Sequence, residues 1–351
     1  MENLEKKIFN SLVAAACGDA IGAATEQRST ECIKERFGGY VTKLTTPPDD
    51  NLAHGMPAGM VTDDFSIAYY SAEDWIKYDS RPTEELAKKT LIRWSDHPEY
   101  TRFIGPTTKK AIAKFKNEES DIDSTNIIDV ISERLLCKNE TVTNGAAMKA
   151  GIVGLINPGN IDRAIDEAII YCLPTHNNWI SLAGACAIAA ATSKALEDNV
   201  TYEDVLEAGL YGAGEGFERA KKVSSPVAGA NIEKKTKLAI DIGKKFQNDF
   251  DQAMKEISEI IGGGLMAYEA VPAAFGHIAA CEGRIKDSVL MGVNGGDDTD
   301  TVACMTGFIV GALSNSENFS EDTINKIEEI NHFDLRKMAS DLYKFNMKEA
   351  Q

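Results

Sequence analysis

Apolar residues recur at intervals of three and four along most of the chain, which is the spacing of one face of an α-helix. Alternating strand-like stretches bounded by Asn-Gly turns are essentially absent. The pattern therefore predicts an all-α protein with a single domain over residues 1–351. The predicted helices cover residues 4–16, 67–76, 161–172, 180–196, 202–211, 238–250, 254–261, 266–281, 302–313 and 324–343.

Several connections are longer than a helical bundle needs. They cover residues 37–60, 96–108 and 261–265, and the last contains three consecutive glycines. Loops of such length in a compact domain often carry function, so we expect functional residues near them. A further glycine pattern at 212–216 follows no predicted strand, so it does not indicate a dinucleotide-binding turn.

The composition narrows the possible partners. With 351 residues, 43% of them hydrophobic, the chain can bury a large core, and its formal net charge is −17. This acidic balance argues against nucleic acid or an anionic membrane surface as a partner and would attract metal ions instead. No uncharged apolar run reaches the length of a membrane span.

The cysteines and histidines indicate the compartment and the type of metal. Seven cysteines are scattered in apolar runs without a Cys-x-x-Cys pair, which predicts buried thiols in a reducing, cytoplasmic compartment. The five histidines form no His-Glu-x-x-His motif, which argues against a zinc site.

Two acidic clusters lie far apart in the sequence. The first is Thr62-Asp63-Asp64, and the second covers residues 297–301 with the sequence DDTDT. Two unit charges about 4 Å apart repel by roughly 4 kcal/mol at an effective dielectric constant near 20. If the clusters meet in the fold, a bound cation would offset this repulsion. Oxygen ligands suit Mg²⁺, Mn²⁺ or Ca²⁺.

Three familiar acidic motifs fit the clusters less well. A helix N-cap needs one Asp or Thr, whereas the second cluster has five in a row. An EF-hand requires Glu at the twelfth position from Asp297, where this chain has Phe308. The DDxxD diphosphate motif also fails on spacing, because Asp63-Asp64 is followed by Phe-Ser-Ile and the second cluster is one residue too short.

Six segments, in order along nearly the whole chain, resemble motifs of the ADP-ribosylglycohydrolase family. They are Gly18-Asp19-Ala20-Ile21-Gly22 with Glu26, Thr62-Asp63-Asp64, Gly105-Pro106-Thr107-Thr108, the NGAAMK segment 144–149, Thr175-His176 and the segment 294–301. The resemblance implies an orthogonal multi-helix bundle with a dinuclear metal site in a central cleft. It implies two divalent ions, Mg²⁺ or Mn²⁺.

The resemblance also implies roles for particular residues. The implied metal ligands are Thr62, Asp63, Asp64, Asp298, Asp300 and Thr301. The residues expected to bind substrate are Asn144, Gly145, His176 and Gly263, and the catalytic candidates are Asp63, Glu26 and Asp300.

The implied reaction is hydrolysis of the N- or O-glycosidic bond at C1 of a ribose. Its transition state resembles an oxocarbenium ion, and a carboxylate such as Asp63 or Glu26 would take a proton from water or give one to the leaving group. The substrate would be an ADP-ribosyl or smaller ribosyl compound, including an ADP-ribosylated protein. The alternatives are an inactive relative that binds ADP-ribose-like ligands and an all-α enzyme acting on diphosphates, which the motif spacing disfavours.

The chain departs from the family pattern at four positions. Phe65 stands where Thr is frequent, Asp297 replaces a Gly, Lys149 replaces Arg and Ile152 replaces Pro. An additional carboxylate near the metals would disfavour a diphosphate. We therefore hypothesise a smaller, nucleoside-like ribosyl substrate.

Overall fold

The computed structural model describes residues 3–102, 104–117, 138–247 and 249–349. Within these ranges the protein is helical, with isolated β-bridges and no strand, which confirms the predicted all-α class. The longer helices are α1 (Asn3–Gly22), α2 (Thr30–Phe37), α3 (Asp63–Tyr78), α4 (Glu84–Trp94), α6 (Pro106–Phe115), α9 (Ile161–Cys172), α10 (Trp179–Ala195), α11 (Tyr202–Ala220), α12 (Ile232–Lys245), α14 (Ala267–Ala280), α15 (Ile285–Asn294), α16 (Thr299–Leu313), α17 (Glu321–Asn331) and α18 (Leu335–Glu349). The short ones are α5 (Pro98–Thr101), η1 (Asn139–Thr141), η2 (Asn144–Ala146), α8 (Gly151–Leu155), α13 (Phe250–Glu256) and the π-helix η3 (Ile257–Ile261).

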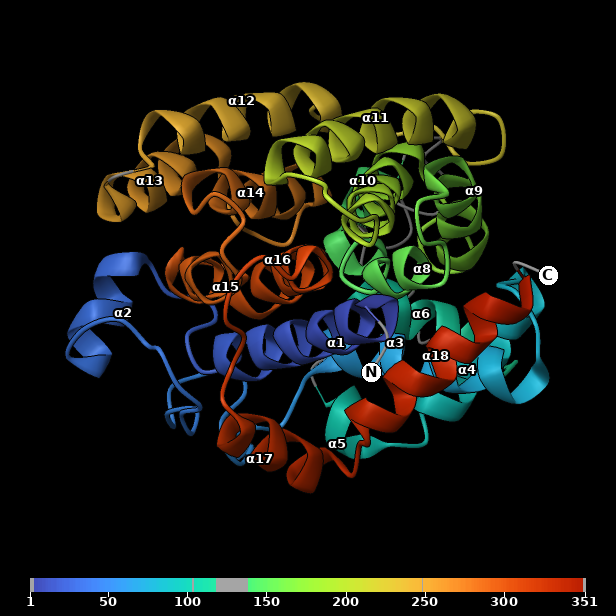
Figure 1. The fold of residues 1–351 in the computed structure, drawn as a ribbon, viewed down its shortest axis with the longest axis horizontal. Helices are drawn as coiled ribbons and strands as arrows, with labels where there is room; N and C mark the ends of the chain where they lie inside the picture. Colours follow the sequence, from blue (N-terminus) through green and yellow to red (C-terminus); the bar gives the residue numbers. More distant parts are fainter. Residues whose placement is uncertain (1–2, 103, 118–137, 248, 350–351) are drawn as a thin grey trace, which may run out of the picture.

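The helices stack in layers around α16, α10 and α1. In Figure 1, α11 and α12 lie uppermost, α10 and α14 below them, then α15 and α16, then α1, and α17 and α18 lie near the bottom. Helices α10 and α16 are buried on all sides, as their Ala- and Gly-rich sequences predict. The largest hydrophobic cluster extends from Ile8 to Phe345 and includes side chains from nearly every layer.

Glycines bring α1 and α16 into very close contact. A Cβ on Gly18 of α1 would lie 2.4 Å from the carbonyl oxygen of Ala303 on α16. In the opposite direction, a Cβ on Gly307 would lie 2.4 Å from the carbonyl oxygen of Ala14. The backbones of the two helices therefore touch, and this contact sets the position of Asp19 relative to Asp300.

We expect Gly307→Ala to lower the free energy of unfolding by about 1–3 kcal/mol, because the added methyl group meets rigid backbone. The control is Gly214→Ala in α11, where the nearest atom to the new methyl group is the mobile carboxylate of Glu233. That variant should be neutral or more stable by up to about 1 kcal/mol, since Ala favours a helix. Urea unfolding of both variants measures the difference. Equal stability of the two would contradict the close packing of α1 on α16.

Two predicted helices have wrong boundaries. The predicted helix 238–250 is two elements, because α12 ends at Lys245 and Asp249 caps the start of α13 by accepting from the Gln252 amide. The predicted helix 324–343 is interrupted at His332, which has a left-handed φ of 56° and ends α17. The glycines of 212–216 lie within α11, as their rejection as a nucleotide-binding turn implied.

The interruption after α17 supports the first acidic cluster. The Asn331 side chain donates to the Gly59 carbonyl at 2.8 Å and accepts from the Val61 amide at 3.0 Å. The end of the long loop 38–62 is thus fixed directly before Thr62, where α3 begins. A continuous helix through position 332 would not leave Asn331 at a helix end.

The cysteine and membrane predictions can be compared with the structure in part. Five of the six described cysteines are buried and all six are free, whereas Cys32 is exposed and Cys137 lies outside the described residues. Over the described ranges, no helix combines the length and the apolar character that crossing a membrane requires.

Candidate functional site

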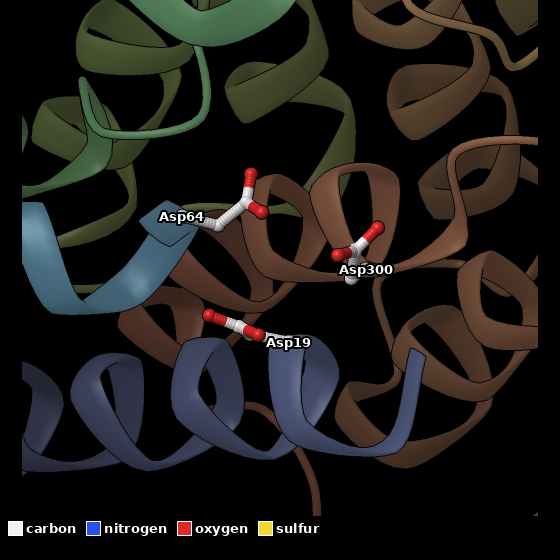
Figure 2. A group of neighbouring side chains, drawn as sticks. All are labelled: Asp19, Asp64 and Asp300. Atoms are coloured by element: carbon white, nitrogen blue, oxygen red, sulfur yellow. The ribbon is translucent and has the colours of Figure 1, made fainter. Parts of the chain in front are cut away.

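Three helices that are distant in sequence bring three carboxylates together. Asp19 of α1, Asp64 of α3 and Asp300 of α16 each place a carboxylate oxygen within 4.8 Å of the other two. Figure 2 shows the three side chains directed toward a common space between the helices. All three residues are buried, with at most 5% of their surface exposed. The two acidic clusters of the sequence therefore meet, and Asp19 joins them.

A second group of carboxylates shares Asp300 with the first. Oxygens of Glu26, Asp298 and Asp300 also lie within 4.8 Å of one another. At that separation each ionised pair repels by about 3 kcal/mol at an effective dielectric constant of 20. Two adjoining groups with one common carboxylate are the arrangement that two neighbouring cations would need.

Asp19 is a site residue that was not among the sequence-predicted site residues. Its carboxylate accepts the Thr62 amide at 2.8 Å and the Phe65 amide at 2.9 Å, so it binds the start of α3 from α1. Its neighbour Gly22 is equally constrained, because a Cβ there would lie 2.6 Å from the Cα of Asp300. The sequence signal was the Gly-Asp-x-x-Gly segment, in which glycines allow close helix packing around one buried carboxylate.

The predicted threonine ligands surround Asp64. The Thr62 hydroxyl donates to one oxygen of Asp64 at 2.8 Å, and the Thr301 hydroxyl donates to the other at 2.7 Å. The Thr62 hydroxyl also accepts the Asp64 amide as the N-cap of α3, so a structural role coexists with its place in the site. Asp63 lines the same cleft but belongs to neither three-carboxylate group.

Asp298 stands at the N-cap position of α16 without serving as a cap. Its side chain makes no capping hydrogen bond. Instead its carboxylate accepts from the Asn144 amide group at 2.7 Å. A capping role for the second cluster therefore fails at this residue, and a helix-initiating carboxylate is left available to the cleft.

Burial and mutual repulsion raise the carboxyl pKa values. Burial, followed by the charges of Asp298 and Asp64, raises the pKa of Glu26 to about 8. Burial and the charge of Asp298 raise the pKa of Asp64 to about 7. The pKa values of Asp19, Asp63 and Asp300 also lie well above the usual range, with burial as the main cause.

The donor set suits hard divalent cations. The described residues lining the cleft include five carboxylates and no Lys or Arg that could balance them. One buried oxygen of Asp300, Oδ1, also lacks a hydrogen-bond partner among the described residues. Carboxylate and hydroxyl oxygens are the ligands that Mg²⁺ and Mn²⁺ accept, so the residues present fit such ions.

Most of the predicted site residues line one cleft. Its lining contains Glu26, Thr62, Asp63, Asp64, Asn144, Gly145, His176, Asp298, Asp300 and Thr301, together with Gly105, Pro106, Thr107, Thr108, Thr143, Met148 and Leu265. Gly263 is the exception, because it lies behind the cleft and its carbonyl accepts the Asp298 amide at 3.1 Å. Thr143, Met148 and Leu265 carried no chemical pattern in the sequence.

His176 is held in the wall of the cleft by two threonine hydroxyls. Its Nε2 lies 2.9 Å from Oγ1 of Thr143, and its Nδ1 lies 2.8 Å from Oγ1 of Thr175. Thr175 also accepts a hydrogen bond at 3.2 Å from the buried ammonium group of Lys149. His176 precedes α10 by three residues, and Asn178 rather than His176 caps that helix.

We expect the His176 imidazole to stay neutral throughout the physiological range. Burial, aided by the Lys149 charge, lowers the pKa of His176 to about 3. Histidine ¹⁵N chemical shifts recorded from pH 5 to pH 8 should show one ring that does not titrate. The signals lost in His176→Gln identify that ring. A titration of these signals near pH 6.5 would contradict the buried position of His176.

Comparison with known proteins assigns the family. The family model described as ADP-ribosylglycohydrolase matches residues 1–350. The chain is 25% identical over 323 residues to ADP-ribosylhydrolase ARH3 of Xenopus tropicalis, covering 88% of this chain and 87% of that protein. It is 24% identical over 334 residues to ADP-ribosylarginine hydrolase Tri1 of Serratia proteamaculans, covering 93% of this chain and 76% of Tri1.

A solved structure shares the fold. The structure titled "ADP-ribosylglycohydrolase-related protein complex" superimposes with a TM-score of 0.64 at 18% sequence identity, covering 99% of this chain and 100% of that one. This similarity supports the all-α architecture alone. From the family match over almost its full length, the chain belongs to the ADP-ribosylglycohydrolase family and is a hydrolase of the glycosidase type.

Proposed function

We propose that this protein is a metal-dependent glycohydrolase that cleaves the N- or O-glycosidic bond at C1 of a ribose in an ADP-ribosyl or smaller ribosyl substrate. The observation that carries the proposal is the pair of three-carboxylate groups that share Asp300 beneath a cleft without lining Lys or Arg. A site of this charge is suited to cations and to the hydroxyl groups of a sugar.

Two divalent ions, with Mg²⁺ preferred and Mn²⁺ as the alternative, fit the donor set. Their ligands would come from Thr62, Asp63, Asp64, Asp298, Asp300 and Thr301, with Asp19 and Glu26 completing the two carboxylate groups. When bound, such ions would hold ribose hydroxyls and make a water molecule more acidic.

The chain's own side chains would handle the protons. Asp63 lines the cleft outside the two groups, so its carboxylate is placed to accept a proton from the attacking water. The raised pKa of Glu26 suits a carboxyl group that gives its proton to the leaving group. Asp300 would orient the other carboxylates, because it is common to both groups.

The opposite wall of the cleft would position the substrate. Asn144, Gly145 and His176 line it, and Asn144 is itself fixed by its bond to Asp298. Gly145 leaves little room for a side chain, because a Cβ there would lie 3.0 Å from the His176 ring. The activities named for ARH3 and Tri1 support an ADP-ribosyl group as one substrate class. The free described cysteines support the cytoplasmic location that the sequence predicts.

A substrate screen tests this proposal. The full chain is incubated with Mg²⁺ or Mn²⁺, and ADP-ribosyl-arginine and a panel of nucleosides are assayed for released ADP-ribose or ribose. The proposal predicts sugar release that a chelator abolishes. Release of phosphate without free sugar would contradict it. Metal binding without turnover of any ribosyl substrate would favour the alternative of an inactive ligand-binding relative.

A further inference from the structure

The charge of the cleft restricts which substrates can enter it. Phosphate groups carry negative charge, and the described lining of the cleft offers them no Lys or Arg. Nearby basic side chains are engaged elsewhere. Lys149 is 1% exposed and donates to Thr175, and Arg28 pairs with Asp50 at 2.9 Å. A phosphate-bearing substrate would therefore depend on bound cations alone for compensation of its charge.

Asp297 adds a carboxylate beside the mouth of the cleft rather than among the metal-binding groups. It has a left-handed φ of 67°, a conformation that glycine adopts without strain. Two backbone hydrogen bonds fix it, one from its amide to the Arg28 carbonyl at 2.9 Å and one to its carbonyl from the Gln27 amide at 2.7 Å. The side chain consequently has a defined direction despite its exposed position.

This carboxylate lies against the triple-glycine loop. The Oδ2 atom of Asp297 is 2.6 Å from the point where a Cβ on Gly264 would lie, and Oε2 of Glu269 is 3.0 Å from the same point. Two carboxylates thus flank Gly264, and the next residue, Leu265, lines the cleft with 48% of its surface exposed. The edge of the cleft at Gly264 and Leu265 is acidic and apolar, without a described cation in its lining.

The Asp297 charge acts on the site itself. It contributes to the raised pKa of Glu26, and it also raises the pKa of Glu269. An anion placed in the cleft near Glu26 would experience the same repulsion, which weakens only slowly with distance in a partly buried site. An uncharged nucleobase would not, and Leu265 offers it an apolar surface.

We propose that Asp297 is a specificity-determining residue that disfavours phosphate groups at the Gly264 edge of the cleft, so that the preferred substrate is a phosphate-free ribosyl compound of the nucleoside class. This inference rests on the proposed glycohydrolase function. It moves the sequence-based hypothesis from a carboxylate among the metal ligands to a carboxylate at the mouth of the cleft.

The test compares two substrates in three proteins. kcat/KM is measured with Mg²⁺ for the best nucleoside of the panel and for ADP-ribosyl-arginine, using the wild type, Asp297→Asn and Asp297→Gly. The wild type should favour the nucleoside at least tenfold. Both variants should shift the ratio at least tenfold toward ADP-ribosyl-arginine, mainly through KM, and Gly at this position removes the carboxylate without backbone strain. Asp322→Asn, an exposed carboxylate on α17, is the control and should leave the ratio unchanged.

The outcomes separate this inference from the proposed function. Faster turnover of ADP-ribosyl-arginine than of every nucleoside by the wild type would overturn the inference and leave the glycohydrolase function standing. An unchanged ratio in both Asp297 variants would overturn the role of Asp297. Absence of sugar release from every substrate would overturn the proposed function and, with it, the inference.

Discussion

Asp300→Asn is expected to abolish hydrolysis and, in the presence of a chelator, to make the protein more stable than the wild type. Asp300 belongs to both carboxylate groups, so its loss should impair the binding of either cation. The expected decrease in kcat/KM is about 10³-fold or more, equivalent to about 4 kcal/mol of transition-state stabilisation. The same change removes a buried negative charge that nearby carboxylates repel.

Two measurements on the same variant separate function from folding. Sugar release is measured with Mg²⁺, and thermal unfolding is measured with a chelator. Asp322→Asn again serves as the control, because it makes the same chemical change on the exposed surface of α17. It should keep both the activity and the melting temperature of the wild type. Full turnover by Asp300→Asn would contradict the role of Asp300, and a lower melting temperature in chelator would show that its charge is not repelled in the fold.

Divalent metal is expected to stabilise the wild type, and the gain should grow as the pH rises. A ligand that binds only the folded state at 100 times its Kd adds about 2.7 kcal/mol to the free energy of unfolding. Protons occupy the site in the absence of metal, because the pKa of Glu26 is about 8 and that of Asp64 is about 7. Raising the pH removes these protons and leaves the site for the cation.

The sign of the pH effect follows from the same shifts. The folded-state pKa values of Glu26 and Asp64 exceed the ordinary carboxyl values of 4.5 and 3.8. The folded protein therefore binds more protons than the unfolded chain over that interval, and this contribution to stability is lost as the pH rises from about 4 to about 8. In chelator, the melting temperature should fall across this range.

Thermal unfolding at several pH values, with Mg²⁺, with Mn²⁺ and with chelator, measures both effects. The expected result is a melting temperature that falls with pH in chelator, and a metal-induced increase of several degrees that is largest near pH 8. The Asp300→Asn variant is the control for the site, since its metal-induced increase should be small. A wild-type melting temperature that is insensitive to both metals at every pH would contradict the proposed metal site.

Periodicity was sufficient for the helices and insufficient for their ends. The helix 161–172 was predicted with its observed boundaries, because Asn160 caps it and its apolar face is regular. The apolar spacing continued through His332, so the end of α17 could not be predicted from it. That end depends on a left-handed residue and on the Asn331 contacts to a loop 270 residues away.

Motif reasoning found most of the cleft but not the residue that links its parts. Five consecutive Asp and Thr residues indicated one half of the site, and their meeting with Asp64 is a structural fact that sequence spacing could only suggest. Asp19 was missed because its role depends on the crossing of α1 over α16 and on the exposed amides at the start of α3. Gly263 was misplaced for the same kind of reason, since a glycine-rich loop does not reveal which of its residues faces the cleft. The single-domain organisation stays a prediction.

The central claim is that Asp19, Asp64 and Asp300, with Glu26 and Asp298, form a site for two divalent cations. The most direct test is anomalous X-ray scattering at the manganese absorption edge from crystals of the full chain grown with Mn²⁺. We predict two peaks, one among Asp19, Asp64 and Asp300 and one among Glu26, Asp298 and Asp300. Active protein whose crystals show no manganese at either position would contradict the account.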